Sequence, residues 1–122
     1  MDRPNTFFNF ADLSEGIERT LAEGIETRVF PGEQAMFSVV SFEAGSEGSI
    51  HSHPEEQWGV LLEGSGTRIQ DGVHVPVGPG DFWRTPGGVE HGFRAGPEGA
   101  RVLDVFAPPR EAYRKSGSGF EA

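Results

Sequence analysis

Apolar and polar residues alternate along much of the chain, which is the pattern of strands that bury one face. Residues 25–29 are Ile-Glu-Thr-Arg-Val and are followed by the turn residues Pro31 and Gly32. Residues 37–42 form a short run of β-branched and aromatic residues that is typical of a buried strand. The same signals predict further strands at 57–63, 67–70, 73–77, 81–85, 89–94 and 100–107.

Turn-forming residues separate these segments. Asp71-Gly72 between two short strands predicts a tight hairpin, because this pair favours the positive φ angles of a type I′ turn. Glycine-rich stretches at 64–66 and 96–99 are expected to end strands and turn the chain. Residues 110–115 suggest one helical turn, and no stretch has the periodicity of an amphipathic helix. The sequence therefore predicts an all-β fold, either a sandwich or a closed barrel.

The length of 122 residues, without a break in composition, predicts one domain spanning residues 1–122. An arm at residues 1–13 carries three phenylalanines, and we expect it to pack on its own domain or on a partner subunit in a homodimer. Residues 116–122 are rich in Gly and Ser and are expected to form a loose tail.

Charge and composition exclude several classes of partner. The formal net charge of −9 argues against nucleic acid, whose phosphates attract basic surfaces, and against an anionic membrane surface. The chain has no cysteine, which excludes disulfides and a thiolate nucleophile. No secretory signal opens the sequence and no run approaches about 18 apolar residues, so we expect a cytoplasmic protein.

The candidate chemistry is concentrated in the stretch from Gly45 to Gly64. His51 and His53 are two residues apart, so both imidazoles leave the same face of an extended strand. Gln57 follows with an amide oxygen, and His91 offers a third imidazole from a distant segment. Imidazole and amide oxygen together suit several divalent transition metals, including Ni, Zn, Mn and Fe. These residues predict a site for one such ion.

Two stretches resemble the motifs of the cupin superfamily, whose RmlC-like members fold as a jelly-roll barrel or double-stranded β-helix. The first motif, at residues 45–64, is Gly-x5-His-x-His-x3-Gln-x6-Gly, with Gln57 where the family usually has Glu. The second motif, at residues 80–95, is Gly-x5-Pro-x-Gly-x2-His-x3-Ala, with Ala95 where the family usually has Asn. The resemblance implies a single cupin domain whose metal ligands are His51, His53, Gln57 and His91.

The end of the chain resembles one group within the cupin superfamily. Residues 104–113 begin Asp-Val-Phe-Ala-Pro-Pro-Arg and look like a segment of the KdgF-type cupins of pectin and alginate degradation. Those metal-dependent isomerases convert 4,5-unsaturated monouronates, which are small anionic sugars, into linear keto-uronates by ring opening and tautomerisation. The resemblance implies that Asp104 is the catalytic carboxylate, that Phe106 lines the pocket and that Arg110 contacts the substrate.

An anionic substrate also constrains the electrostatics of the pocket. A chain with a net charge of −9 repels such a molecule, so the pocket itself must be locally positive. We expect the metal and Arg110 to supply this charge, with help from Arg68 or Arg84.

Two other functions stay open on the sequence alone. A site with three histidines and an open metal position also suits an Fe(II) dioxygenase of the quercetinase kind, which Gln57 does not exclude. A non-catalytic cupin that binds a small sugar would use the same pocket without turnover. The metal and the source of the uronate, pectin or alginate, also stay open, since several first-row ions accept these ligands.

Overall fold

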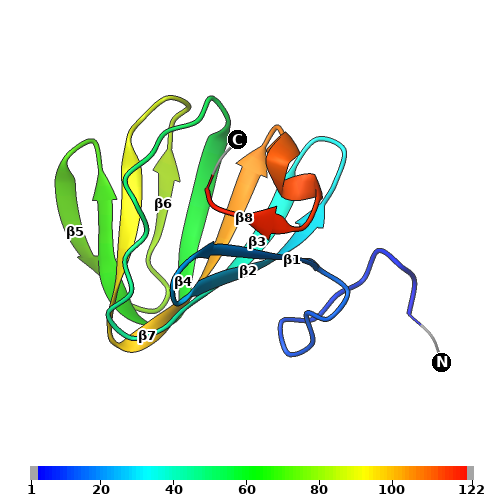
Figure 1. The fold of residues 1–122 in the computed structure, drawn as a ribbon, viewed down its shortest axis with the longest axis horizontal. Helices are drawn as coiled ribbons and strands as arrows, with labels where there is room; N and C mark the ends of the chain where they lie inside the picture. The colour runs from blue at the N-terminus through cyan, green and yellow to red at the C-terminus, as the bar shows by residue number, and fades with distance from the viewer. Residues whose placement is uncertain (1–2, 121–122) are drawn as a thin grey trace.

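The structure is a computed structural model that describes residues 3–120. Over that range it contains eight strands and one short 3₁₀ helix (Figure 1). The strands are β1 (Ile17–Ala22), β2 (Ile25–Pro31), β3 (Met36–Phe42), β4 (Glu56–Gln70), β5 (Val73–Val77), β6 (Phe82–Thr85), β7 (His91–Ala107) and β8 (Gly117–Ser118). The helix, η1, spans Glu111–Arg114. Among the described residues, no helix is long and apolar enough to cross a membrane.

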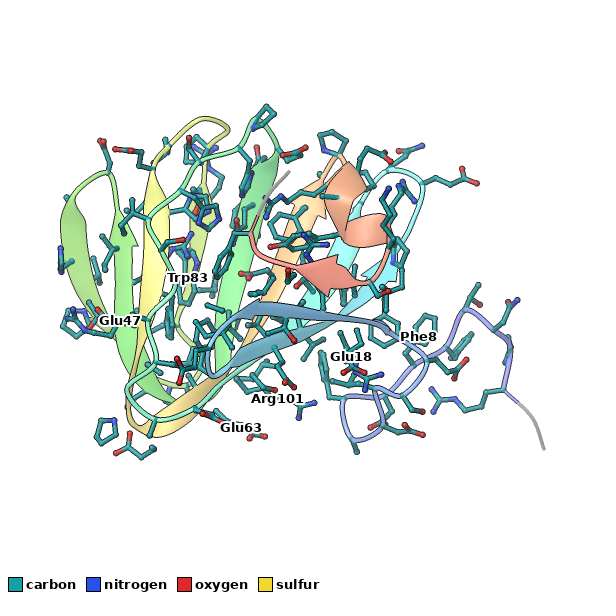
Figure 2. The ribbon with its side chains drawn as sticks, in the orientation of Figure 1. Phe8, Glu18, Glu47, Glu63, Trp83 and Arg101 are labelled. Atoms are coloured by element: carbon teal, nitrogen blue, oxygen red, sulfur yellow. The ribbon has the colours of Figure 1, made fainter. Side chains whose placement is uncertain are left out.

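All of these strands join one sheet in the order β5-β4-β7-β3-β2-β1-β8, and β6 pairs with β4 beside β5. Within the described range every strand pairing is antiparallel except the short contact between β1 and β8. The sheet curls so that side chains of β1 and β3 meet those of β4 and β7 around one interior (Figure 1 and Figure 2). The all-β prediction is therefore confirmed, with the barrel as its form.

The buried face of the strands is apolar, as the alternation predicts. In β2, Ile25, Thr27 and Val29 are buried whereas Glu26 is exposed. The buried apolar side chains form two clusters, a larger one between β1, β2, β3, β7 and η1 and a smaller one between β4 and β7. Members of both clusters line the interior cavity, so the polar residues of the site lie between two apolar groups.

β4 and β7 are longer than predicted. The two glycine-rich stretches that we expected to end strands lie instead inside β4 and β7, so that prediction was wrong. The reason is that the two stretches face each other: Gly66 pairs with Ala95 and Gly64 pairs with Ala100. The residues between Ala95 and Ala100 therefore bulge out of the ladder, and the strands bend without reversing the chain.

Other local predictions are confirmed. Asp71 and Gly72, with φ angles of 50° and 76°, form the turn of the β4–β5 hairpin. The helical turn expected within residues 110–115 is η1. Both features depend on a few neighbouring residues, which is why the local sequence predicts them.

The C-terminal tail is held against the barrel, which differs from the loose segment expected over 116–122. Gly117–Ser118 pairs with β1 as β8. The guanidinium of Arg19, which is 6% exposed, donates hydrogen bonds to the carbonyl oxygens of Ala112, Ser118 and Gly119. The tail is held through its backbone carbonyl groups, and its Gly- and Ser-rich sequence does not predict these hydrogen bonds. Residues 121–122 lie outside the described range.

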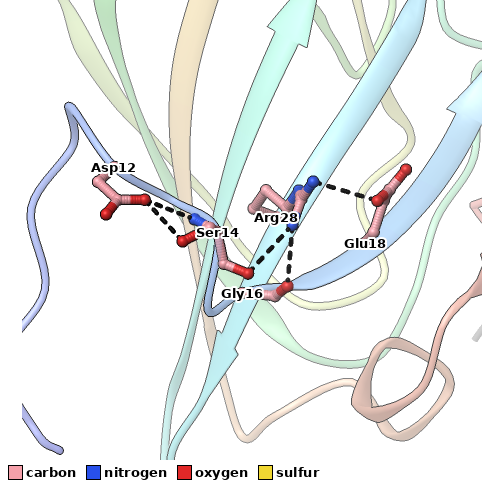
Figure 3. Close-up of polar contacts among 5 residues, drawn as sticks. All are labelled: Asp12, Ser14, Gly16, Glu18 and Arg28. Carbon is pink, nitrogen blue, oxygen red and sulfur yellow. Dashed lines mark hydrogen bonds and ion pairs between the residues drawn. The ribbon is translucent and has the colours of Figure 1, made fainter.

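The N-terminal arm packs partly on its own domain. The ring of Phe8 lies 4.7 Å from the ring of Phe30 in β2, measured between centroids. Polar contacts hold the end of the arm: Arg28 donates to the carbonyl oxygens of Ser14 and Gly16 and pairs with Glu18, and Ser14 donates to Asp12 (Figure 3). The three phenylalanines of the arm stay largely exposed, and the homodimer expected from them stays a prediction.

Candidate metal centre

Three histidine side chains converge in the interior of the barrel. One ligand atom from each of His51, His53 and His91 lies within 4.8 Å of the other two. His51 and His53 precede β4, and His91 opens β7. The backbones of His51 and His91 exchange hydrogen bonds of 3.0 and 2.9 Å, which hold these two distant segments together. The convergence that the sequence predicts is therefore present.

A backbone carbonyl orients each imidazole. The Nδ1 atoms of the three rings lie 3.0, 3.1 and 2.8 Å from the carbonyl oxygens of Ser49, Glu55 and Val89, respectively. Since a carbonyl oxygen only accepts hydrogen bonds, these contacts assign the ring proton to Nδ1. Each Nε2 then keeps a lone pair, which is the form in which an imidazole binds a metal.

The surroundings also keep the three imidazoles neutral. Burial lowers the pKa of His51 and the pKa of His53 below the usual 6.5, and it lowers the pKa of His91 to about 3. The cationic Arg110 lowers the first two further, and Arg68 acts on His51 and His91 in the same direction. The three lone pairs are therefore free of protons at neutral pH and available to a metal ion.

Gln57 in β4 lies at a fourth ligand position. Its Oε1 is 3.0 Å from Nε2 of His53, and the residue is 4% exposed. Its side chain also lies beside the carboxyl group of Asp104, whose pKa it helps to lower. Two lone-pair atoms at this distance match ligands of one cation, because ligands at right angles with bonds of about 2.1 Å lie about 3 Å apart.

These residues therefore fit a divalent metal ion. Nε2 of His91 is buried and has no hydrogen-bond partner among the described residues, although buried polar atoms nearly always have one. A cation bound by three imidazole lone pairs and an amide oxygen would satisfy this atom. The donor set accepts several first-row ions, so it does not choose among Ni, Zn, Mn and Fe.

Asp104 in β7 lies beside Gln57 in the same cavity. Its Oδ1 is buried and has no hydrogen-bond partner among the described residues. Burial raises the pKa of Asp104 above the usual 3.8, and the nearby Arg68, Gln57 and Arg110 oppose this rise. Its strand partner is Gly59, where an added Cβ would clash with the Trp83 indole nitrogen and lie 3.0 Å from Oδ1 of Asp104. The glycine therefore provides the space in which the Trp83 indole and the Asp104 carboxyl group sit.

Phe106 and Arg110 complete the predicted set. The Phe106 ring meets the His53 ring edge-on, with 5.5 Å between centroids. The guanidinium carbon of Arg110 lies 4.3 Å from the centroid of Tyr113 and 5.3 Å from that of Phe106, and Nη2 donates to the carbonyl oxygen of Phe120. The structure thus brings all the predicted site residues together, while their individual roles stay predictions.

Two contributors to the cavity were not clear from the sequence. Arg68 is 5% exposed and lines the cavity, whereas Arg84, its alternative, is half exposed. Counting strand parity from Gln57 would point Arg68 outward, but register shifts between Leu61 and Gly66 reverse the parity of β4. The second contributor is the Phe120 ring, which no local signal in the tail marks.

Comparisons with known proteins agree with this geometry. A family model described as a cupin domain matches residues 38–106. The oxalate decarboxylase OxdC of Bacillus subtilis is 30% identical over 109 residues, which cover 84% of this chain and 28% of the decarboxylase. The dimethylsulfoniopropionate lyase DddW of Ruegeria pomeroyi is 36% identical over 89 residues, which cover 73% of this chain and 57% of the lyase. The chain therefore spans less than two thirds of the length of either relative.

Solved structures show the same fold. KdgF from Halomonas sp. superposes with a TM-score of 0.78 at 25% identity, covering 89% of this chain and 98% of that protein. A structure of the Bacillus subtilis oxalate decarboxylase, described with Mn(II) centres, superposes with a TM-score of 0.74 at 24% identity, covering 89% of this chain and 33% of that protein. These matches confirm the jelly-roll barrel that the two sequence motifs imply.

Proposed function

This chain belongs to the cupin family, and from that premise we propose that it is a metal-dependent enzyme that converts 4,5-unsaturated monouronates into linear keto-uronates. The observation that carries the proposal is the buried carboxyl group of Asp104 beside the ligand Gln57. A buried carboxylate repels an anionic ligand and weakens its binding, so its presence favours proton transfer over binding alone. The likeness to KdgF, at 25% identity, supports the same reaction.

The ligand set decides how much positive charge the centre presents. A divalent ion held by His51, His53, His91 and Gln57 would supply a Lewis acid for negative charge that develops on a substrate oxygen. Gln57 is a neutral ligand, whereas a glutamate would reduce the net charge of the centre by one. The three carbonyl groups that hold Nδ1 of each imidazole fix the direction of the lone pairs.

Asp104 would move the proton that the isomerisation requires. In its ionised form it accepts the proton of the anomeric hydroxyl as the bond between C1 and the ring oxygen breaks, which leaves an aldehyde at C1 and an enolate at C5. It then returns that proton to C4, and the C5 enolate becomes a ketone, so no atom or electron is gained or lost. Burial raises the pKa of Asp104 and makes it a better match for this exchange near neutral pH.

The cavity is narrow in this conformation, with a volume of about 30 Å³. That is room for about one water molecule, so a sugar acid cannot enter while the tail stays in place. Phe120 lies over His51 with 4.8 Å between ring centroids, and its carbonyl oxygen accepts the hydrogen bond from Arg110. Substrate entry would displace Phe120 and free the guanidinium of Arg110 to contact the substrate.

The direct test is to mix the metal-loaded protein with a 4,5-unsaturated monouronate and follow the loss of the ultraviolet absorbance of the enol ether. We expect metal-dependent loss of the absorbance at the same rate with and without oxygen. Asp104→Asn should reduce the rate about 100- to 10,000-fold, because proton transfer by a positioned group contributes about that much. The variant should keep its metal content, since Asp104 is not a ligand.

Three outcomes would count against the proposal. An oxygen requirement with iron loaded would favour the dioxygenase, and substrate binding without turnover would favour a sugar-binding cupin. Full activity of Asp104→Asn would remove Asp104 from the chemistry. The cytoplasmic location expected from the sequence stays a prediction, which fractionation of the source cells would test.

A further inference from the structure

Arg68 is a buried cation that has no role in the proton transfer proposed above. It lies in the second half of β4, is 5% exposed and lines the cavity that holds the histidines. Its guanidinium carbon lies 5.4 Å from the ring centroid of Trp83, whose side chain points into the interior (Figure 2). In this position the guanidinium is removed from water and lies against an aromatic ring in a narrow cavity.

Neutral groups hold the guanidinium in place. Its Nη2 donates to Oγ1 of Thr85 at 2.7 Å, and its Nε is 3.3 Å from Oε1 of Gln70. The same Oε1 accepts from the Thr85 hydroxyl at 2.7 Å, and the Gln70 amide nitrogen donates to the carbonyl oxygen of Arg84. This chain of hydrogen bonds fixes the orientation of Arg68 but brings no negative charge to it.

The positive charge of Arg68 is not neutralised by a salt bridge. None of the ion pairs within residues 3–120 includes Arg68 or Arg110, and Asp104 is the only acidic residue that lines the cavity. Burial lowers the pKa of Arg68 to about 10 although the negative charge of Asp104 opposes this fall, so Arg68 is still cationic at neutral pH. Two guanidiniums and one carboxyl group leave the interior positive even before an ion binds. Burying unpaired charge is costly, and such charges normally have a partner.

We infer that Arg68 is an anion-binding residue that receives the carboxylate of the substrate inside the barrel. The inference rests on the proposed function, because it names the residue that would hold the uronate carboxylate. Arg110 is less suited to this task, since Phe120 and two aromatic rings already surround its guanidinium. Arg84 is unsuited, because its side chain is half exposed and lies 3.8 Å from Glu56.

The test uses two non-reactive probes, galacturonate and its methyl ester, which carries one more methyl group and lacks the negative charge. Their dissociation constants are measured by calorimetry on the metal-loaded wild type and on Arg68→Met. Arg84→Met is the matched control, because it removes the same charge from the outside of the barrel. Arg68→Met should still fold, since methionine is similar in length and Thr85 and Gln70 keep the hydrogen bond between them.

We expect the wild type to bind galacturonate more tightly than the ester. Arg68→Met should weaken galacturonate binding about 10- to 100-fold, the effect of losing a charge-assisted hydrogen bond, and leave the ester unchanged. Arg84→Met should bind both probes like the wild type. Arg68→Lys should recover only part of the affinity, because an ammonium cannot form the two parallel hydrogen bonds of a guanidinium.

The failures of the two proposals are distinguishable. Equal affinity for acid and ester, loss of both in Arg68→Met, or no binding of galacturonate would overturn the role of Arg68, even if the unsaturated uronate is converted. An Arg68-dependent preference for the acid, in a protein that does not convert the unsaturated uronate, would keep the anion site and overturn the proposed reaction.

Discussion

At the scale of single residues, Gln57 explains how a metal centre and a buried carboxylate can be neighbours. Its amide oxygen faces His53, and its side chain lies beside Asp104. A glutamate at this position would place a second carboxylate beside Asp104 and raise its pKa, because a like charge disfavours the ionised form. A neutral candidate ligand therefore allows Asp104 to ionise beside the predicted metal site.

The burial of Asp104 also leads to a prediction about the pH dependence of stability. The folded-state pKa of Asp104 lies above the usual 3.8, so its contribution to stability is complete below about pH 3.8 and is lost as pH rises through the folded-state pKa. Asp104→Asn has a similar shape and never ionises. Its free energy of unfolding, without metal, should therefore exceed that of the wild type at neutral pH and match it near pH 3.5.

Urea unfolding at several pH values between about 3.5 and 8 measures this difference. The control is Asp71→Asn in the exposed β4–β5 turn. A difference between Asp104→Asn and the wild type that stays constant, or shrinks as pH rises, would contradict the buried and costly charge.

At the scale of elements, the site depends on the pairing of β4 with β7. Gln57 faces Phe106, Gly59 faces Asp104, and Gln70 at the other end of β4 faces His91. One antiparallel pair therefore carries a candidate metal ligand, the candidate catalytic residue and a second candidate ligand at fixed spacing. The bulges in this pair are what turn Arg68 inward, so they position the interior charge as well as bending the strands.

At this scale we predict that the C-terminal tail limits access to the metal site. Phe120→Ala should open the cavity, because the ring covers His51. We expect the variant to release its metal to a chelator several-fold faster than the wild type while keeping a similar melting temperature. Phe82→Ala, which removes a 70% exposed ring from β6, is the control. Equal release rates for Phe120→Ala and the wild type would show that the tail does not limit access.

At the scale of the whole molecule, charge is segregated between the surface and the interior. The chain has a net charge of −9, yet the cavity is lined by two guanidiniums and a single acidic residue, Asp104. If the proposed anion site is correct, this positive interior would attract anions that the outer surface repels. Added salt screens exposed charges more than buried ones, so it weakens the outer repulsion first.

The exposed arm leads to a prediction about the oligomeric state of the protein. Beside the arm, Phe10 and Leu13 line an apolar groove with Phe30, Phe37 and Val39. We predict a homodimer in which a second copy covers this groove, because contiguous exposed apolar surface favours association. Phe10→Ser combined with Phe37→Ser should raise the dimer dissociation constant at least tenfold, as sedimentation equilibrium would measure. A wild type that is monomeric at high concentration would contradict the prediction.

The sequence by itself determined the fold class and most of the site. The alternation of apolar residues, the Asp71-Gly72 turn and the two histidine motifs are local signals, and each is read from a few neighbouring residues. The convergence of His51, His53 and His91 follows from the motifs once the barrel is assumed. These features depend on backbone periodicity and turn chemistry, which act over short distances along the chain.

Only the tertiary structure decided which groups share the interior. The glycine stretches extend β4 and β7 because each meets the other across the sheet, and the resulting register shifts turn Arg68 inward. Phe120 reaches His51 because Arg19, a hundred positions earlier, binds the tail carbonyls. Burial, charge pairing and pKa depend on atoms that are close in space and far apart along the chain, so no local pattern contains them.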